Sequence, residues 1–195
     1  IDAGASDIRV DIENGGVDLI RVRDDGAGIT RADLPLALAR HATSKLRSFD
    51  ELQNVVTLGF RGEALPSIAS VARVRLSSRT RTADYAYGVE LAGSANPGVS
   101  APCAHPPGTT VEVRDLFFNT PARRRFLRTA RTEFLHIDAT LKRIALAAPQ
   151  TRIQLHAGTR RVFDAPAAAA EPTRRLQALL GKAFAQDAVV VADRA

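Results

Sequence analysis

Hydrophobic and polar residues alternate near the start of the chain, as they do along strands that bury one face. Apolar side chains occupy every second position in residues 8–12 and again in residues 20–23, on either side of Asn14-Gly15-Gly16. Alternate side chains of a strand point to opposite faces of its sheet, and the Asn-Gly-Gly sequence is typical of a tight turn. The pattern therefore predicts a β-hairpin.

Apolar residues spaced three or four positions apart predict helices further along the chain. One helix is expected at residues 33–38, where Thr30 and Asp33 resemble a capping box, and another at residues 63–71. Thr120-Pro121 is expected to begin a short helix, with the threonine as its cap. The clearest helical stripe comprises Phe134, Ile137, Leu141, Ile144 and Ala148.

The remaining apolar segments predict further strands and complete a fold class. Strands are expected at residues 74–78, 85–91 and 109–113, and a last hairpin at residues 152–156 and 160–164. Residues 93–108 are rich in Pro and Gly, which predicts a loop. Helices and mainly antiparallel strands in this order predict an α+β sandwich, with helices on one face of a mixed β-sheet.

A change in composition near residue 165 predicts a domain boundary. We expect one domain over residues 1–165, an Ala/Pro/Glu-rich linker at 166–173 and the truncated start of a second domain at 174–195. In that last part, residues 174–184 have a helical pattern and residues 188–192 resemble a strand. The chain has no Met and begins Ile1-Asp2-Ala3-Gly4, so we expect it to be a fragment of a longer protein.

Composition narrows the classes of function only slightly. Hydrophobic residues make up 45% and charged residues 25%, which is ordinary for a globular protein. Cys103 is the single cysteine, which excludes an internal disulfide and a cysteine-based zinc site. No apolar run approaches the roughly 18–20 residues of a membrane span. The net charge of +6 permits contact with a polyanion without requiring it, and we attribute the excess of Arg over Lys first to genomic composition.

Strand parity makes Asp24 the first candidate for chemistry, in the string Asp24-Asp25-Gly26-Ala27-Gly28-Ile29. Asp24 shares a strand face with Ile20 and Val22, which is expected to be the buried face. A buried carboxylate needs strong hydrogen-bond donors, and an adenine amino group is one, with Gly26 and Gly28 letting a flat base approach the backbone. The alternative is a glycine-rich turn whose aspartate caps the next helix.

Two further segments have the residue types that bind phosphate. Glycines that lead into a helix leave backbone N–H groups free for an anion, as in Gly59-Phe60-Arg61-Gly62-Glu63-Ala64-Leu65. Upstream, Thr43, Ser44 and Lys45 offer two hydroxyls and an ammonium. A plain loop before a helix explains the first segment equally well, and a solvated loop explains the second better on spacing alone. The hydroxyl of Thr109 is expected to form a hydrogen bond either with a buried base or with the backbone.

These strings are specific when they are taken together and in order. The chain carries Asp-Ala-Gly-Ala at residues 2–5, the two strings above, and Gly-Thr-Thr at residues 108–110, and so resembles the GHKL ATPase superfamily, which includes gyrase, Hsp90, histidine kinases and MutL. Residues 39–45 and 58–65 resemble the MutL family in particular. So does Leu-Phe-Phe-Asn-Thr-Pro-Ala-Arg-Arg-Arg-Phe-Leu at residues 116–127. The resemblance covers nearly the whole chain and disfavours another GHKL branch.

The resemblance implies a Bergerat-type sandwich that binds Mg-ATP under a lid, followed by a ribosomal-protein-S5-like domain. Asp24 matches the aspartate that receives the adenine amino group, and Thr109 matches a threonine at the same base. Gly28 and Ile29 match residues that line the adenine pocket. Thr43, Ser44 and Lys45 match the lid and phosphate loops, as do Gly59, Phe60, Arg61, Gly62, Glu63, Ala64 and Leu65.

The chain departs from the family pattern at its first motif. In the family, a glutamate that activates water and an asparagine that holds magnesium precede the Ser-Ile/Leu-Asp-Ala-Gly string, and this chain starts at the Ile. Phosphoryl transfer depends on positioning, metal charge and an oriented nucleophile. We therefore expect no catalytic base and no metal ligand within the 195 residues, and no ATP hydrolysis by them. Lys45 is the candidate for stabilising phosphate charge.

For the intact protein the resemblance implies DNA mismatch repair in the cytoplasm, associated with the nucleoid during repair. Slow ATP hydrolysis is expected to act as a switch that promotes dimerisation of N-terminal domains, with DNA, a MutS-type mismatch sensor and a downstream nuclease or helicase as partners. The basic residues Arg123, Arg124, Arg125, Arg128 and Arg131 either contact DNA phosphates or form a solvated helical face. The alternative function is a nucleotide-gated scaffold, in which ATP binding matters and hydrolysis is incidental.

Overall fold

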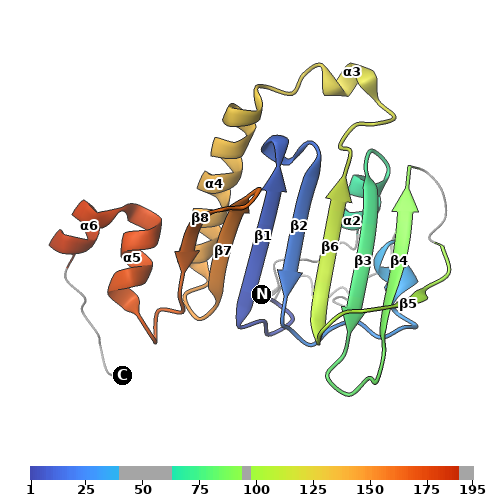
Figure 1. Cartoon of the computed structure of the whole chain (residues 1–195), viewed down its shortest axis with the longest axis horizontal. Helices are drawn as coiled ribbons and strands as arrows, with labels where there is room; N and C mark the ends of the chain where they lie inside the picture. Colours follow the sequence, from blue (N-terminus) through green and yellow to red (C-terminus); the bar gives the residue numbers. More distant parts are fainter. Residues whose placement is uncertain (40–62, 94–97, 189–195) are drawn as a thin grey trace, which may run out of the picture.

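A single mixed β-sheet organises the chain (Figure 1). The computed structural model describes residues 1–39, 63–93 and 98–188 of the 195. The sheet has the strand order β5-β4-β3-β6-β2-β1-β7-β8, and β1 and β7 pair in parallel while the other neighbours are antiparallel. Its strands are β1 (Asp7–Glu13), β2 (Leu19–Asp24), β3 (Arg73–Arg79), β4 (Ala86–Ala92), β5 (Ala101–Cys103), β6 (Gly108–Arg114), β7 (Arg152–Ala157) and β8 (Arg160–Ala165).

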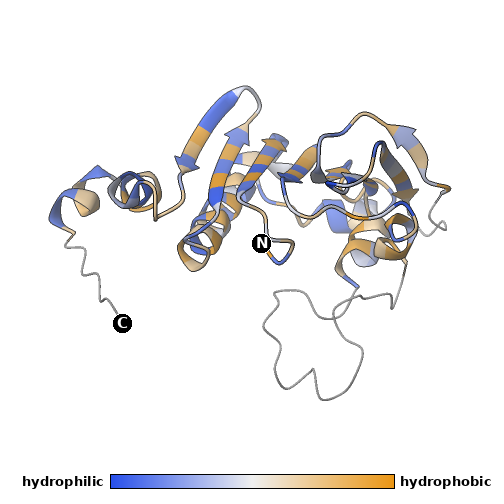
Figure 2. Cartoon of the chain, turned by 90° about the horizontal axis from the view of Figure 1, so that it is seen from below, coloured by the Kyte–Doolittle hydropathy of each residue, from blue (hydrophilic) through white to orange (hydrophobic). Residues whose placement is uncertain are grey.

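Helices cover one face of this sheet, which confirms the predicted α+β architecture. Viewed from below, α1, α2 and α4 lie on the same side of the strands, and α5 and α6 lie beyond β8 (Figure 2). The helices are α1 (Leu34–Ala37), α2 (Ala64–Ala69), α3 (Pro121–Arg124), α4 (Ala130–Ala147), α5 (Pro172–Leu180) and α6 (Lys182–Asp187), with a 3₁₀ turn, η1, at Asn14–Gly16. Among the described residues, none of these helices has the length and apolar character needed to cross a membrane.

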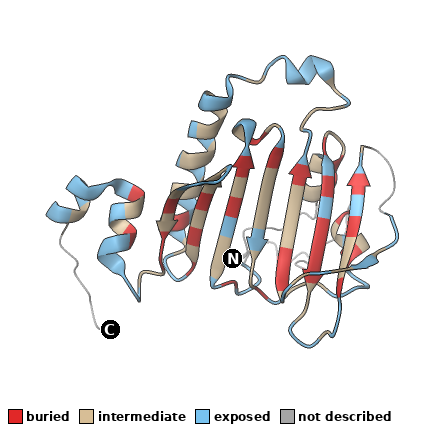
Figure 3. Cartoon of the chain, viewed as in Figure 1, coloured by how far each residue is buried: buried red, intermediate tan, exposed pale blue. Residues whose placement is uncertain are grey.

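The core forms as rows of apolar side chains that cross four strands on the helix-covered face. Strand register aligns one row of Val10, Val22, Val111 and Leu76, and a second row of Ile12, Ile20, Val113 and Val74. Exposed and buried residues alternate from Arg73 to Leu76 on β3, as the pleat requires (Figure 3), and the two serines that follow are both buried. The helices add Leu34, Leu38 and Ala69 over β3 and β4, and Phe134, Ile137 and Ala145 over β1 and β7.

The opposite face of the sheet carries charged residues whose signs alternate from strand to strand. Asp11, Arg21, Glu112, Arg75 and Glu90 are successive register partners on β1, β2, β6, β3 and β4. Arg21 Nε donates to Glu112 Oε2 over 2.7 Å, and Arg75 lies 3.6 Å from Glu90. Burial opposes ionisation of Glu112, but Arg21 and then Arg114 outweigh it and lower the pKa of this carboxyl. This face is therefore polar and largely neutralised by its own pairs.

The structure differs from the predicted elements at three places. Residues 93–108 are not all loop, because Ala101–Cys103 forms β5 at the sheet edge. The predicted helix at 174–184 is two helices, because Gly181 has a φ of 95° and interrupts the hydrogen-bonded backbone. Thr120 precedes α3 as predicted, but its side chain does not cap the helix, and its buried Oγ1 has no hydrogen-bond partner in the described part of the chain. The strand predicted at residues 188–192 lies almost entirely outside the described residues.

Candidate functional site

At one end of the sheet, the apolar rows are followed by a row of three polar residues, Asp24, Thr109 and Ser78, which we call the polar row. In the register, Asp24 on β2 lies beside Thr109 on β6, which lies beside Ser78 on β3. These positions continue the face that carries Val22, Val111 and Leu76, so Asp24 lies where strand parity predicts it. Asp24 is half-buried, and Thr109 and Ser78 are buried, with 8% and 1% of their surfaces exposed.

Ser78 joins three segments of this site through a single hydroxyl. Its Oγ accepts a hydrogen bond from the backbone N–H of Ile29 over 2.8 Å, and lies 2.7 Å from the carbonyl oxygen of Gly108 and 2.9 Å from Thr109 Oγ1. The strand end, the 24–29 loop and the start of β6 are thereby fixed to one another. The sequence analysis did not identify Ser78. A signal was present, since Ser78 is a polar residue on the strand face that Val74 and Leu76 share.

The glycines around Asp24 are required by the protein's own backbone. A Cβ on Gly28, whose φ is +74°, would lie 2.2 Å from the carbonyl oxygen of Arg79. A Cβ on Gly108 would lie 2.1 Å from the carbonyl oxygen of Asp24, and one on Gly26 would lie 2.9 Å from Ala3. Side chains at these positions would push apart the segments that frame Asp24. The sequence explanation, close approach of a flat base, is therefore not needed to account for these glycines.

Asp25 ties the first residues of the chain to the same loop. Its Oδ1 accepts the backbone N–H groups of Ser6 and Asp7 over 2.8 and 2.9 Å, and its Oδ2 accepts the Ser6 hydroxyl. The Ala27 N–H also donates to the carbonyl of Ala3 over 3.0 Å. Burial raises the pKa of the Asp25 carboxyl, but the hydrogen bonds from Ser6 and Asp7 outweigh burial, and the net pKa lies below its ordinary value. The string at residues 2–5 therefore lies against the loop that follows Asp24.

Several residues predicted for phosphate binding lie outside the described part of the chain: Thr43, Ser44, Lys45, Gly59, Phe60, Arg61 and Gly62. Of the remainder, Glu63 is the residue that precedes α2, and Ala64 and Leu65 form its first turn. Leu65 packs against the core beneath β3 and β4. The described residues thus place Asp24, Gly28, Ile29 and Thr109 together and leave the phosphate assignments as predictions.

The basic residues at 123–131 do not share one helical face. Arg123 and Arg124 end α3, Arg125 and Arg128 lie in the connection, and Arg131 lies in the first turn of α4. All five are exposed, and none forms an ion pair with a described carboxylate. Phe126, in the middle of this basic cluster, is 86% exposed. The cluster is a basic surface with an apolar side chain at its centre.

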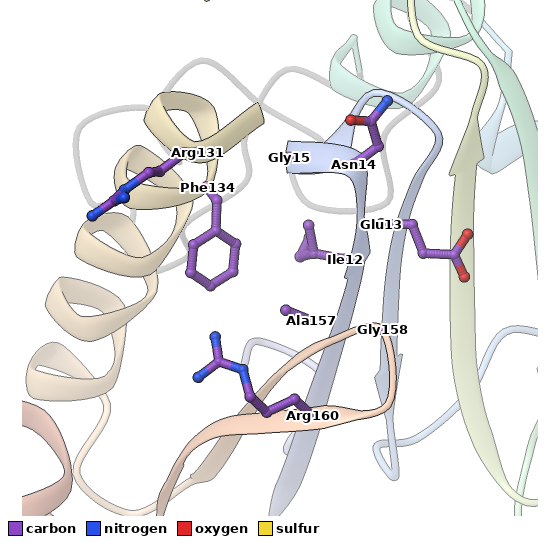
Figure 4. Close-up of a pocket in the computed structure, with 9 residues that line it drawn as sticks. All are labelled: Ile12, Glu13, Asn14, Gly15, Arg131, Phe134, Ala157, Gly158 and Arg160. Atoms are coloured by element: carbon purple, nitrogen blue, oxygen red, sulfur yellow. The ribbon is translucent and has the colours of Figure 1, made fainter. Parts of the chain in front are cut away.

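A cavity of about 360 Å³ lies at the far end of β1 from the polar row (Figure 4). Figure 4 shows Phe134 and Arg160 facing the space between α4 and the β7–β8 hairpin, with Ile12 and Ala157 to one side of it. Arg131 lines it as well, so the cavity continues the basic cluster. It adjoins Ile12 and not Ile8, the register partner of Asp24, and is therefore separate from the site that sequence reasoning predicted.

No protein-family model matches the chain, but whole-sequence comparison finds many relatives. The chain is 52% identical over 193 residues to the DNA mismatch repair protein MutL of Pseudomonas fluorescens, covering 98% of this chain and 30% of that protein. It is 51% identical to MutL of Mannheimia succiniciproducens, over 98% of this chain and 31% of the relative. The chain thus spans about a third of the length of the curated relatives that it matches.

Solved structures agree with the sequence comparison. The Aquifex aeolicus MutL ATPase domain complexed with ADP is 30% identical, has a TM-score of 0.70, and is matched over 92% of this chain and 62% of that one. The N-terminal domain of a DNA repair protein, at 22% identity, supports the fold alone, with a TM-score of 0.75 over 95% of this chain and 54% of that one. Both structural matches extend over almost the whole of this chain.

Proposed function

Since this chain belongs to the MutL family, we propose that it binds an adenine nucleotide at the polar row and serves DNA mismatch repair as part of a longer protein. The observation that carries the proposal is the carboxylate of Asp24 at the end of two apolar rows. Its Oδ1 accepts the N–H of Gly26 over 2.9 Å, and its Oδ2 has no partner among the described residues. A carboxylate oxygen in this setting favours a ligand that donates a hydrogen bond.

The adenine amino group can donate hydrogen bonds to the acceptor oxygens of this site. Thr109 lies beside Asp24 in the register, so the two side chains are within reach of one small donor group. Gly28 and Ile29 follow Asp24 directly, and we propose that they line the base. The related MutL ATPase domain from Aquifex aeolicus is complexed with ADP, which supports a nucleotide as the ligand.

Nucleotide affinity of the 195-residue chain tests this proposal. We expect Asp24→Ala to weaken ADP binding at least about tenfold by calorimetry, because a hydrogen bond to a half-buried carboxylate is lost. The matched control is Asp18→Ala, since Asp18 directly precedes β2, at the opposite end of the strand from Asp24. Its carboxylate is exposed and, among the described side chains, is hydrogen-bonded to Asn14. Equal losses in both variants, or undetectable ADP binding by the unchanged chain, would contradict the proposal.

The proposed binding sites for the nucleotide phosphates and for the metal ion rest on the resemblance to the MutL family. Thr43, Ser44 and Lys45, together with residues 59–65, are proposed to hold the triphosphate, and Mg²⁺ is proposed to accompany it. Among the described residues, no group of three or more His, Cys, Asp or Glu side chains is placed to hold a metal ion. By the same resemblance, we propose that the family's asparagine for magnesium and its glutamate for water activation are supplied from residues that precede Ile1.

We therefore propose that hydrolysis requires those two upstream residues. The test compares ATP turnover by the 195-residue chain with turnover by a chain extended upstream through the glutamate and asparagine. The extended chain is expected to turn over ATP slowly, and its Glu→Gln variant to resemble the shorter chain. Equal turnover by all three proteins would overturn the assignment of the base.

For the whole protein we propose an ATP-driven switch that links mismatch recognition to repair. ATP is expected to promote dimerisation of N-terminal domains and to change contacts with DNA, a MutS-type sensor and a downstream nuclease or helicase. The second candidate is a nucleotide-gated scaffold that needs binding alone. Repair by a hydrolysis-dead variant whose dimers form normally with ATP would favour the scaffold, and loss of repair would favour the switch.

A further inference from the structure

The hydrogen atoms of the Ser78–Thr109 pair have one consistent arrangement. A backbone N–H can only donate, so the contact with Ile29 uses a lone pair of Ser78 Oγ. A carbonyl oxygen can only accept, so the contact with Gly108 uses the one hydroxyl hydrogen of Ser78. In the third contact, Thr109 must therefore donate to Ser78.

This arrangement determines what Thr109 offers to a ligand. Its only hydroxyl hydrogen is directed to Ser78, and its Oγ1 has no other partner among the described residues. The two lone pairs of this oxygen can only accept. Asp24, beside it in the register, has carboxylate oxygens that also accept. The two neighbouring side chains thus present two acceptors and no donor.

We propose that Ser78 is a positioning residue that makes this site select a 6-amino purine over a 6-oxo purine. The proposal rests on nucleotide binding at Asp24. An amino group has two hydrogens, enough for both acceptors, whereas the carbonyl oxygen of a 6-oxo purine would face two oxygens without a hydrogen between them. A site whose buried polar groups are left unpaired by the wrong ligand discriminates strongly against it.

Burial makes the arrangement effective. Ser78 has 1% of its surface exposed and Thr109 has 8%, so water does not readily supply an alternative donor to either hydroxyl. The neighbouring Ser77 is buried as well, but it lies at the opposite strand parity, and its side chain makes no hydrogen bond with any described residue. Ser77 therefore provides a control on the same strand.

The experiment measures the ratio of ADP to IDP affinity, because hypoxanthine has an oxo group in place of the 6-amino group of adenine, together with a hydrogen on N1. The unchanged 195-residue chain is expected to prefer ADP at least about tenfold. Ser78→Ala releases the Thr109 hydroxyl, which can then rotate and donate to a 6-oxo group, and the ratio is expected to fall about fivefold or more. Ser77→Ala is expected to keep the ratio of the unchanged chain.

Two variants at Thr109 keep the test decisive if Ser78→Ala does not fold. Thr109→Ser retains the hydroxyl and is expected to keep the preference, and Thr109→Val removes the acceptor and is expected to reduce it. A ratio that is the same in Ser78→Ala and Thr109→Val as in the unchanged chain would overturn the inference while ADP binding remains. Absence of ADP binding in the unchanged chain would instead remove the proposed function on which it rests.

Discussion

At the scale of single residues, Asp25 holds the start of the chain in place. Its carboxylate accepts three hydrogen bonds from Ser6 and Asp7, which precede and begin β1. We expect Asp25→Ala to reduce the free energy of unfolding by about 1 kcal/mol, after allowing for the partial exposure of these bonds. Asp25→Asn keeps an acceptor oxygen and is expected to lose less. Denaturant titration of both variants measures the difference, and equal losses would contradict a role for the hydrogen bonds.

Protonation of Asp25 is expected to make the stability of the folded chain depend on pH, in a direction that its pKa determines. Its folded pKa lies below the unfolded value of about 3.9, because the hydrogen bonds from Ser6 and Asp7 outweigh the effect of burial. Its contribution to stability is therefore complete above the unfolded pKa and is lost as the pH falls through the folded pKa. The difference in melting temperature between the unchanged chain and Asp25→Asn is expected to be constant from about pH 7 to 5 and to shrink below about pH 4.

Gly28 shows how one backbone position shapes the site. It has a positive φ, and a Cβ there would lie 2.2 Å from the carbonyl oxygen of Arg79. Gly158 also has a positive φ but has nothing within 4 Å of the same position. Gly158→Ala is expected to cost about 1–2 kcal/mol from backbone strain alone, and Gly28→Ala to cost at least about 1 kcal/mol more. Similar unfolding free energies for the two variants would show that the contact with Arg79 is easily relieved.

At the scale of elements, a buried arginine joins α5 to the rest of the molecule. Arg175 has 4% of its surface exposed, and its guanidinium donates to the carbonyls of Ala145, Ala148, Thr151, Ala165 and Pro166. Two of these carbonyls belong to the C-terminal end of α4, where a positive charge is favoured by the helix dipole. Its described partners include no carboxylate, so backbone carbonyls compensate the desolvated charge, and burial lowers the pKa of Arg175.

Arg175→Met is therefore expected to destabilise the protein by about 2–4 kcal/mol, because it leaves several buried carbonyls without a donor. The adjacent Arg174→Met is the control, since Arg174 is exposed and pairs only with Glu171. Chemical denaturation followed by circular dichroism compares the two. If both variants unfold at the same denaturant concentration as the unchanged chain, α5 does not depend on this arginine.

Most elements could be predicted because their buried faces repeat with a fixed period. The β1–β2 hairpin, the parity of Asp24 and the stripe on α4 all follow from such repeats. β5 could not be predicted in this way, because a strand of three residues is too short to show a periodic pattern. Its pairing with β4 depends on the rest of the sheet. Ser78 was missed for a related reason: its partners come from three segments that are distant in sequence. The linker predicted at residues 166–173 and the domain division stay predictions.

At the scale of the whole molecule, the polar row and the basic cluster lie at opposite ends of the sheet. β2 runs from the turn at η1 down to Asp24, whereas α3 and the start of α4 lie beyond the other end of the strands (Figure 1). The cavity beside Arg131 lies at the same end as the basic cluster. Nucleotide binding and DNA contact, as proposed, would therefore use separate surfaces joined by the strands between them.

This separation predicts that DNA affinity and nucleotide affinity can be changed independently. Arg125→Glu is expected to weaken binding of duplex DNA and to reduce the slope of log affinity against log salt by about 1, because one phosphate contact is lost. ADP affinity is expected to stay unchanged. The control is Arg23→Glu, an exposed residue beside Asp24 on the opposite strand face, which changes the net charge equally. If both reversals weaken DNA binding to the same extent, the effect comes from overall charge, and the basic cluster is only a solvated surface.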